Sequence, residues 1–325
     1  MTIDANDTTI AGAGADANHR EPRGANHVAP TDRAVPAGRA GYWNLGGQLP
    51  VARMGFGAMR LAGRGFEGPK GDPARAVAVL RRAVELGVDH IDTAAFYFYE
   101  DLAANALIRE ALHPYPEHLV IATKVGPDRS PDGQWLPPAG PDGLRAAVHR
   151  NLRELGRDHL DLVHLRVQLA DTAASVAERF GVLAELREQG LIRHLGLSNV
   201  HAGQLAEAQE AAPVATVQNW YTASRRGDDE LLRSCARQGI AFTPFFPLGG
   251  EELLGSPRLA EIAARYGARP AQIALTWLLA RSPAVLAIPG TASLAHLEDN
   301  VAAAALRLDT EDLAAVDALG GDARP

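Results

Sequence analysis

The chain has 325 residues with a formal net charge of -7 at pH 7, and 46% of its residues are hydrophobic and 22% charged. This near-average composition excludes a wholly disordered, collagenous or coiled-coil protein. The negative net charge argues against nucleic acid or an anionic membrane surface as a partner, so small molecules are the expected partners. Cys235 is the only cysteine, which excludes an intrachain disulfide framework and a multi-cysteine metal site, so no metal is expected.

The first 41 residues are rich in Ala, Gly, Pro, Asp, Thr and Arg and contain no aromatic side chain. They offer too little apolar surface to offset the entropy of ordering, so residues 1–41 are predicted to form a disordered tail and residues 42–325 a single folded domain. The N-terminus lacks a signal-peptide pattern, and no run of about 18 apolar residues follows. A cytoplasmic location is therefore expected.

From Tyr42 onward, short apolar strands alternate with helical stretches. A hairpin is predicted around Gly46 and Gly47, followed by a strand over 53–57. The first helix is expected to begin after Asp72, an N-cap residue followed by proline, and to end at Gly87. Further strands are predicted over 89–92, 119–125, 160–165, 192–198, 213–218, 240–245 and 284–290. Further helices are predicted over 102–112, 143–155, 173–189, 202–211, 228–238, 258–281 with interruptions at Gly267 and Pro270, 294–303 and 310–319.

Strict alternation of strand and helix favours the α/β class with a parallel sheet, because parallel neighbours need a crossover connection. Eight such units close a (β/α)8 TIM barrel, preceded here by an N-terminal β-hairpin cap. The alternative is a doubly wound open sheet, for which Gly63, Gly65 and Gly68 supply a G-x-G-x-x-G pattern. A dinucleotide fingerprint needs a helix that starts within the motif, whereas Pro69 and Pro73 delay the helix. The stretch is therefore interpreted as a mobile glycine loop.

Active sites of such barrels lie at the carboxyl ends of the strands, so the polar residues found there are the candidates. Asp92 follows the second strand, Tyr97 comes five residues later, and Lys124 ends the third strand. A buried ammonium beside a phenol favours the phenolate, and an aspartate keeps the lysine charged, so this set can move a proton near neutral pH. Each residue alone also fits an ordinary turn or surface role. Their common position on one rim is what indicates chemistry.

Several motifs, in order and with matching spacing, resemble the aldo-keto reductase family, in its bacterial NADPH-dependent oxidoreductase branch. They are FGAMRL at 56–61, GVDHIDTAAFY at 87–97, LVIATKVG at 119–126, LIRHLGLSN at 191–199, VQN at 217–219, and IPGT with EDN within 288–300. The resemblance spans about 42–305. It implies a (β/α)8 barrel that transfers a hydride between NADPH and an aldehyde or ketone.

The resemblance also implies roles for the rim residues. Tyr97 corresponds to the general acid/base, Lys124 to the residue that tunes it, and Asp92 to the partner of the lysine. Tyr99 is a rival for the acid, because the FYFY run lengthens this loop. Tyr99 and Trp135 are otherwise expected to line an open substrate pocket.

One member of the set departs from the family pattern. The family places a histidine five residues after the aspartate of the fourth strand, and from Asp161 that position is Arg166. His164 lies two residues deeper and is expected to fill a layer of the barrel. Arg166 is permanently charged, can donate hydrogen bonds to a substrate oxygen, and would further favour phenolate.

The cofactor site follows from the same resemblance. Hydroxyl and amide groups of Ser198, Asn199 and Gln218 are expected to bind the nicotinamide carboxamide, while Phe245 stacks on its ring or is simply a core aromatic. NADPH is favoured, with NADH as the alternative, because Thr291 and His296 can hold a phosphate. The complete predicted cofactor set is Gly57, Ala58, Met59, Ser198, Asn199, Gln218, Phe245, Leu248, Gly290, Thr291, His296, Asp299 and Asn300.

Three functions remain open at this point. The preferred one is an NAD(P)H-dependent carbonyl reductase. The alternative, suggested by Arg166, is a cofactor-binding regulatory or redox-sensing protein with little turnover. A third is a barrel lyase or isomerase that uses Lys124 as a Schiff base. The sequence names neither the physiological substrate nor the oligomeric state.

Overall fold

The computed structural model describes residues 35–64, 66–168 and 173–320. Most of the predicted tail, residues 1–34, lies outside the described residues. Residues 35–41 were assigned to the tail, but Ala37–Ala40 form a 3-10 helix, and the amide of Ala37 donates to the carbonyl of Leu86 at 3.0 Å. The folded part therefore begins earlier than predicted. Alanine and glycine bury well against a neighbouring helix, which a search for large apolar side chains overlooks.

Parallel strands form one curled seven-stranded sheet in the order β13-β12-β11-β10-β9-β6-β3. The strands are β3 (Phe56–Gly57), β6 (His90–Asp92), β9 (Val120–Val125), β10 (Leu160–Arg166), β11 (Ile192–Ser198), β12 (Val214–Gln218) and β13 (Ala241–Phe242). The segment predicted as the eighth strand makes only isolated parallel bridges, from Val285 to Phe242 and from Ala287 to Met54. These bridges join the two edges of the sheet, and the predicted (β/α)8 barrel is confirmed.

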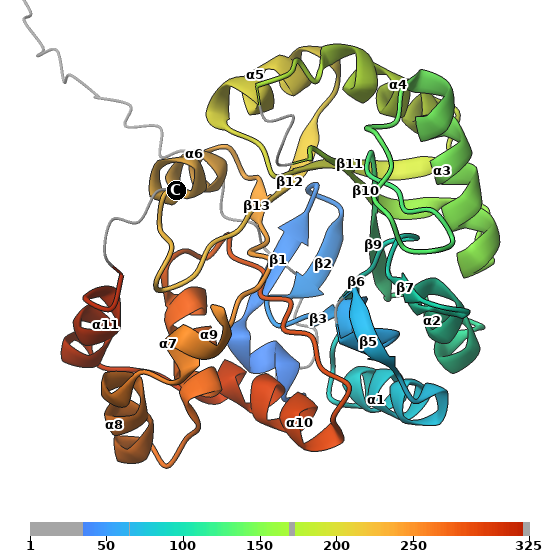
Figure 1. Cartoon of the computed structure of the whole chain (residues 1–325). Coiled ribbons are helices and arrows are strands. Elements are labelled where there is room, and N and C mark those ends of the chain that lie inside the picture. The colour runs from blue at the N-terminus through green and yellow to red at the C-terminus, as the bar shows by residue number, and fades with distance from the viewer. Residues whose placement is uncertain (1–34, 65, 169–172, 321–325) are drawn as a thin grey trace, which may run out of the picture.

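The helices surround the sheet on its outside (Figure 1). Helix α1 (Pro73–Glu85) begins as predicted, because the Asp72 side chain accepts a hydrogen bond from the Arg75 amide. The predicted helix over 258–281 is two helices, broken where Gly267 and Pro270 were expected to break it. A short helix, α7 (Gly250–Leu254), was not predicted, because five residues are too few to show a helical period. The others are α2 (Ala104–Leu112), α3 (Pro141–Leu155), α4 (Ala177–Glu188), α5 (Ala202–Ala211), α6 (Asp229–Arg237), α8 (Pro257–Arg265), α9 (Pro270–Ala280), α10 (Leu294–Ala302) and α11 (Thr310–Asp317).

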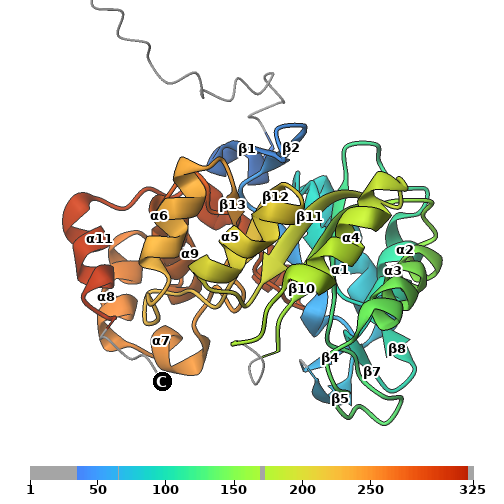
Figure 2. The same ribbon diagram turned by 90° about the horizontal axis from the view of Figure 1, so that it is seen from above.

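A β-hairpin closes one end of the barrel, as the sequence predicted. Strands β1 (Tyr42–Leu45) and β2 (Leu49–Ala52) pair in antiparallel register. Leu45 and Val51 of this hairpin pack in one buried cluster with barrel residues Val120, Ala122, Leu162, Ala215, Ala241 and Leu286. Figure 2 shows the hairpin at one end of the barrel and strands β4 (Gly63–Arg64) and β5 (Glu67–Lys70), with α7, at the other. The second end is where the parallel strands finish, and it is the end available for a site.

The glycine-rich stretch after β3 is more ordered than the predicted mobile loop. Strands β4 and β5 pair in antiparallel register, and residue 65 between them lies outside the described residues. Gly71 then passes close to the main chain, since a β-carbon there would lie 2.2 Å from the carbonyl oxygen of Leu61. The first helix starts only at Pro73, after the glycine pattern. This agrees with the rejection of a dinucleotide fingerprint.

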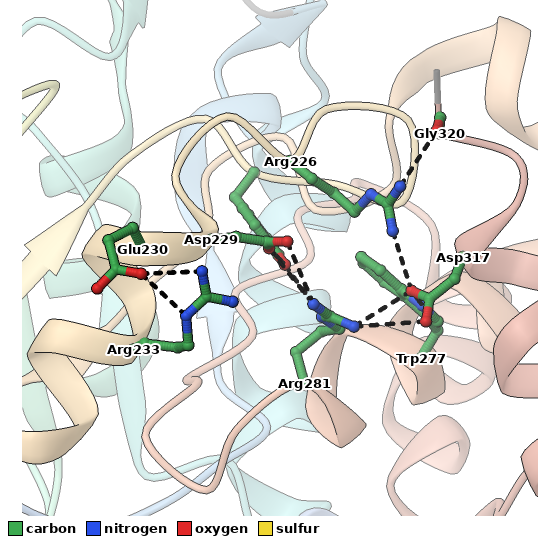
Figure 3. A network of polar contacts seen from close by, with 9 residues as sticks. Arg226, Asp229, Glu230, Arg233, Trp277, Arg281, Asp317 and Gly320 are labelled. Atoms are coloured by element: carbon green, nitrogen blue, oxygen red, sulfur yellow. Dashed lines mark hydrogen bonds and ion pairs between the residues drawn. The ribbon is translucent and has the colours of Figure 1, made fainter. Parts of the chain in front are cut away.

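Helix α11 packs on the outside of the barrel, as expected, and a polar network holds it there (Figure 3). The carboxylate of Asp317 accepts hydrogen bonds from Nε1 of Trp277 at 2.9 Å and from Nη1 of Arg281 at 3.2 Å. Arg226 donates to the same carboxylate and to the carbonyl of Gly320. The last helix is thus joined both to α9 and to the segment before α6.

Candidate active site

A buried ion pair lies at the carboxyl ends of two neighbouring strands. Asp92 ends β6, and Lys124 lies next to the end of β9, which pairs with β6 in parallel register. The Lys124 Nζ atom lies 2.5 Å from Oδ1 of Asp92 and donates to the carbonyl of Thr93 at 3.0 Å. Lys124 is only 1% exposed and Asp92 only 4%. Burial of these charges is tolerable because they are paired with each other and hydrogen-bonded.

Tyr97 lies beside this pair. It is 8% exposed, and the Lys124 Nζ atom is 4.8 Å from the centroid of its ring. Its main chain is held on both sides, because its amide donates to Ala94 and its carbonyl accepts from Ala104, each at 2.9 Å. The structure therefore brings the predicted tyrosine, lysine and aspartate together.

The rival tyrosine faces a different part of the molecule. Tyr99 belongs to β7 (Phe98–Tyr99), which pairs with β8 (Leu102–Ala103). Its hydroxyl packs so close to Gly68 that a β-carbon there would lie 2.6 Å from it. Within the described part of the chain, Tyr99 has no hydrogen bond to Asp92 or Lys124.

Amide and hydroxyl groups of β11 and β12 reach the same rim. Parallel register places Ser198 beside Gln218, whose Nε2 atom donates to Oδ2 of Asp92 at 2.8 Å. The Oε1 atom of Gln218 is buried and finds no hydrogen-bond partner among the residues the structure describes. Asn199, at φ 62°, donates from Nδ2 to the carbonyl of Val167. An unpaired buried acceptor is costly, so Gln218 is suited to an external N–H donor such as a carboxamide.

Arg166 lies beside Ser198 and Phe245. Its Nη1 atom donates to Oγ of Ser198 at 2.9 Å, and its guanidinium carbon lies 4.8 Å from the centroid of the Phe245 ring. The described contacts of Arg166 thus involve two predicted nicotinamide-binding residues and not Tyr97. The expected action of Arg166 on the phenol receives no support from this arrangement.

The predicted glycines of the cofactor set meet where the barrel closes. A β-carbon on Gly290 would lie 2.5 Å from the carbonyl oxygen of Gly57, and one on Gly57 would lie 2.7 Å from that of Ile288. Ala58 and Met59 follow directly in the 3-10 helix Ala58–Arg60. Close packing of main chain against main chain explains these glycines without reference to a ligand.

Most of the remaining predicted cofactor residues lie on α10 or just before it. The Thr291 Oγ1 atom accepts from the Ser293 amide, and Ser293 in turn caps α10 at the His296 amide. Asp299 pairs with Arg269 at 3.0 Å, while Asn300 is buried. Arg269 was missed by the sequence analysis, because it belongs to the segment before α9 and only the fold brings it to α10. Leu248 is half-buried, in the turn before α7.

Aromatic rings surround the proposed acid. Phe96 packs edge-on against Tyr97, with ring centroids 5.2 Å apart, and Phe66 lies 6.1 Å from Tyr97. Trp135, half-exposed, packs against both Phe96 and Phe66, at 5.7 and 5.0 Å. The predicted pocket residue Trp135 is therefore close to the acid, whereas Phe66 was not predicted because it lies in the stretch interpreted as a glycine loop.

The described residues contain neither a candidate metal site nor a candidate membrane span. No group of three or more His, Cys, Asp or Glu residues in 35–64, 66–168 and 173–320 is arranged to hold a metal ion. No helix in the same ranges has the length and apolar character needed to cross a membrane.

His164 fills a layer of the barrel interior, as expected. It is 1% exposed, and its Nε2 atom lies 2.7 Å from Oγ1 of Thr216. Burial lowers the pKa of His164 from 6.5 to about 4. As the pH falls, His164 therefore takes up a proton in the unfolded chain before it does so in the folded chain. The contribution of neutral His164 to the free energy of unfolding is complete above pH 6.5 and is lost as the pH falls toward 4.

This linkage predicts a pH-dependent stability. Between pH 7 and pH 5, His164 is expected to account for a loss of about 2 kcal/mol in the free energy of unfolding. Urea denaturation at both pH values measures the loss. The variant His164→Asn should show a correspondingly smaller loss, whereas His118→Asn, at an exposed position, should behave like the parent chain. Equal losses in the parent and the His164 variant would contradict the assignment.

Comparisons with known proteins cover most of the chain. The model of the Aldo/keto reductase family matches residues 53–320. A pyridoxine 4-dehydrogenase of Escherichia coli is 49% identical over 277 residues, which cover 84% of this chain and 96% of that protein. An uncharacterized oxidoreductase of Schizosaccharomyces pombe is 39% identical, with 88% and 92% covered. A solved aldo-keto reductase from Klebsiella pneumoniae, in complex with NADPH, is 26% identical with a TM-score of 0.73, and 87% and 96% of the two chains are covered.

Proposed function

The chain belongs to the aldo/keto reductase family, and we propose that it interconverts an aldehyde or ketone and the corresponding alcohol with NADPH, using Tyr97 as general acid/base. One observation carries this proposal: a buried ammonium, Lys124, lies against the ring of a buried tyrosine and is itself paired with Asp92. No covalent nucleophile is needed for such chemistry.

The proposed roles follow from charge. When bound, NADPH would supply the hydride for the carbonyl carbon. Tyr97 delivers its phenolic proton to the carbonyl oxygen, so that an alcohol forms, and in the reverse direction it accepts the proton of the alcohol. Lys124 stabilises the phenolate that is left, and Asp92 balances the lysine charge while the phenol is protonated.

The residues present fit the cofactor. The unpaired Oε1 atom of Gln218 suits the N–H groups of the carboxamide, with Ser198 and Asn199 beside it. The amino end of α10 attracts phosphate, and Thr291 and His296 lie there. Arg269 forms an ion pair with Asp299 further along the same helix. The relative solved with NADPH supports the same choice.

For the substrate, we propose an aromatic alcohol and its aldehyde, with pyridoxine as the first alcohol to test. The aromatic rings of Phe66, Phe96 and Trp135 near Tyr97 suit a flat ring. The name of the relative at 49% identity gives the same compound class.

The test is a cofactor titration followed by turnover. Quenching of intrinsic fluorescence measures the Kd of NADPH and of NADH, and NADPH oxidation is then followed with pyridoxal, benzaldehyde and an aliphatic aldehyde. We expect tighter binding of NADPH and faster turnover with the aromatic aldehydes. Binding without turnover on any of them would overturn the enzymatic proposal in favour of a regulatory cofactor-binding protein.

Variants of Arg166 distinguish a carbonyl reductase from a regulatory cofactor-binding protein more directly. If Arg166 holds Ser198 in place for the cofactor, Arg166→His removes the charge-assisted hydrogen bond to Ser198. The Kd of NADPH should then rise by about tenfold, with no gain in kcat. Fluorescence titration and steady-state rates measure both quantities. Arg166→Lys, which keeps the charge, is the matched variant. A large rise in kcat for Arg166→His would show that the arginine suppresses turnover.

A further inference from the structure

A second buried cation lies near the proposed acid. Arg129 follows β9 and is only 7% exposed. Its guanidinium carbon lies 4.7 Å from the ring centroid of Phe98, 5.0 Å from that of Phe66 and 5.8 Å from that of Trp135. Among the described residues no carboxylate forms an ion pair with it, and burial lowers its pKa. A buried charge needs good hydrogen bonds, so the partners of this group are informative.

Those partners are main-chain carbonyls on both sides of Tyr97. The Nη1 atom of Arg129 donates to the carbonyl of Phe98 at 2.8 Å and to that of Phe96 at 3.4 Å, and Nε donates to that of Gly133 at 3.0 Å. Of these bonds, two go to the residues that directly precede and follow the proposed acid. The guanidinium therefore joins the main chain of Tyr97 to the segment 128–136.

That segment is itself well anchored. Arg129 and Trp135 form an antiparallel bridge, and the amide of Leu136 donates to the carbonyl of Asp128 at 2.9 Å. The carboxylate of Asp128 accepts from Nη1 and Nη2 of Arg150, on α3, at 2.9 and 3.0 Å. Any displacement of the main chain around Tyr97 must therefore break bonds that lead back to a helix of the barrel.

We propose that Arg129 is a positioning residue for the reaction: by bonding the carbonyls on either side of Tyr97, it holds the phenol between Lys124 and the substrate. This inference rests on the proposed function, because it assigns a role relative to the acid. A proton donor held a fraction of an ångström out of place loses much of its rate, so the effect should appear in kcat.

The test compares variants of the full chain. Arg129→Met keeps much of the volume but removes the donors and the charge, and Arg129→Lys keeps the charge with fewer donors in a different geometry. Arg53→Met is the matched control, because Arg53 also donates to carbonyls, those of Leu279, Ser282 and Val285, but before β3 at the other end of the strands. For each variant, kcat, KM, the Kd of NADPH and the melting temperature are measured.

Arg129→Met is expected to lower kcat by about 10- to 100-fold with the Kd of NADPH changed by less than about twofold. Arg129→Lys should recover part of kcat, while Arg53→Met should lower the melting temperature without a comparable loss of kcat.

The inference is overturned if Arg129→Met keeps the kcat of the parent, if its Kd of NADPH rises as much as its kcat falls, or if Arg53→Met loses as much kcat. Should the methionine variant fail to fold, the lysine variant decides, and an unchanged kcat in it would count against the role. The outcome for Tyr97→Phe is separate. Full activity in Tyr97→Phe would overturn the proposed function itself. Full activity in Arg129→Met, with Tyr97→Phe inactive, would overturn only the positioning role.

Discussion

Replacement of Tyr97 by phenylalanine is expected to lower kcat by about 10³-fold and to change the Kd of NADPH by less than about twofold. The substitution removes only the hydroxyl, so the ring keeps its contacts with Phe96 and with the Lys124 ammonium. Steady-state reduction of an aromatic aldehyde measures kcat, and fluorescence titration measures the affinity.

The control is the same change two residues later. Tyr99→Phe removes a hydroxyl that packs near Gly68, and kcat should stay close to that of the parent. If instead Tyr99→Phe loses activity and Tyr97→Phe keeps it, the acid is Tyr99. Full activity in both variants would exclude Tyr97 and Tyr99 as the acid.

Lys124→Met is expected to lower both turnover and stability. The loss of the ammonium leaves the Asp92 carboxylate buried without its charged partner, although the Gln218 amide still donates to it. The free energy of unfolding should fall by about 3 kcal/mol, and kcat should fall by about 10²-fold or more because the phenolate is no longer stabilised.

A double variant separates these two effects. Lys124→Met with Asp92→Asn removes both charges, so it should recover part of the lost stability and none of the lost kcat. Urea denaturation and steady-state rates make the comparison. If stability does not recover, the loss in the single variant is a packing defect. If kcat recovers, Lys124 does not assist the acid.

The sequence predicted the barrel well because its signals are local. The N-cap Asp72 with Pro73, the breaks at Gly267 and Pro270, and the apolar strands with their spacing each depend on neighbouring residues only. The register of parallel strands then brought Asp92 and Lys124 together, and the loop after β6 placed Tyr97 beside them, as expected for residues at carboxyl ends.

What the sequence did not reveal depends on contacts between distant segments. The Arg129 bonds to the carbonyls of Phe96 and Phe98 span more than thirty residues and carry no local pattern. Arg269 reaches α10 only through the packing of α9 and α10. The position of Arg166 beside Ser198, on the neighbouring strand, likewise follows from the folded register and not from its place in a motif.

The contact between Gly57 and Gly290 has a consequence for anyone who wishes to alter what this protein accepts. Both positions neighbour the proposed cofactor site and would attract randomisation in a directed-evolution library. A methyl group at either would collide with a main-chain oxygen, which cannot rotate away as a side chain can. Diversity is better placed at Trp135, whose half-exposed ring can be exchanged without forcing the barrel open at its closing edge.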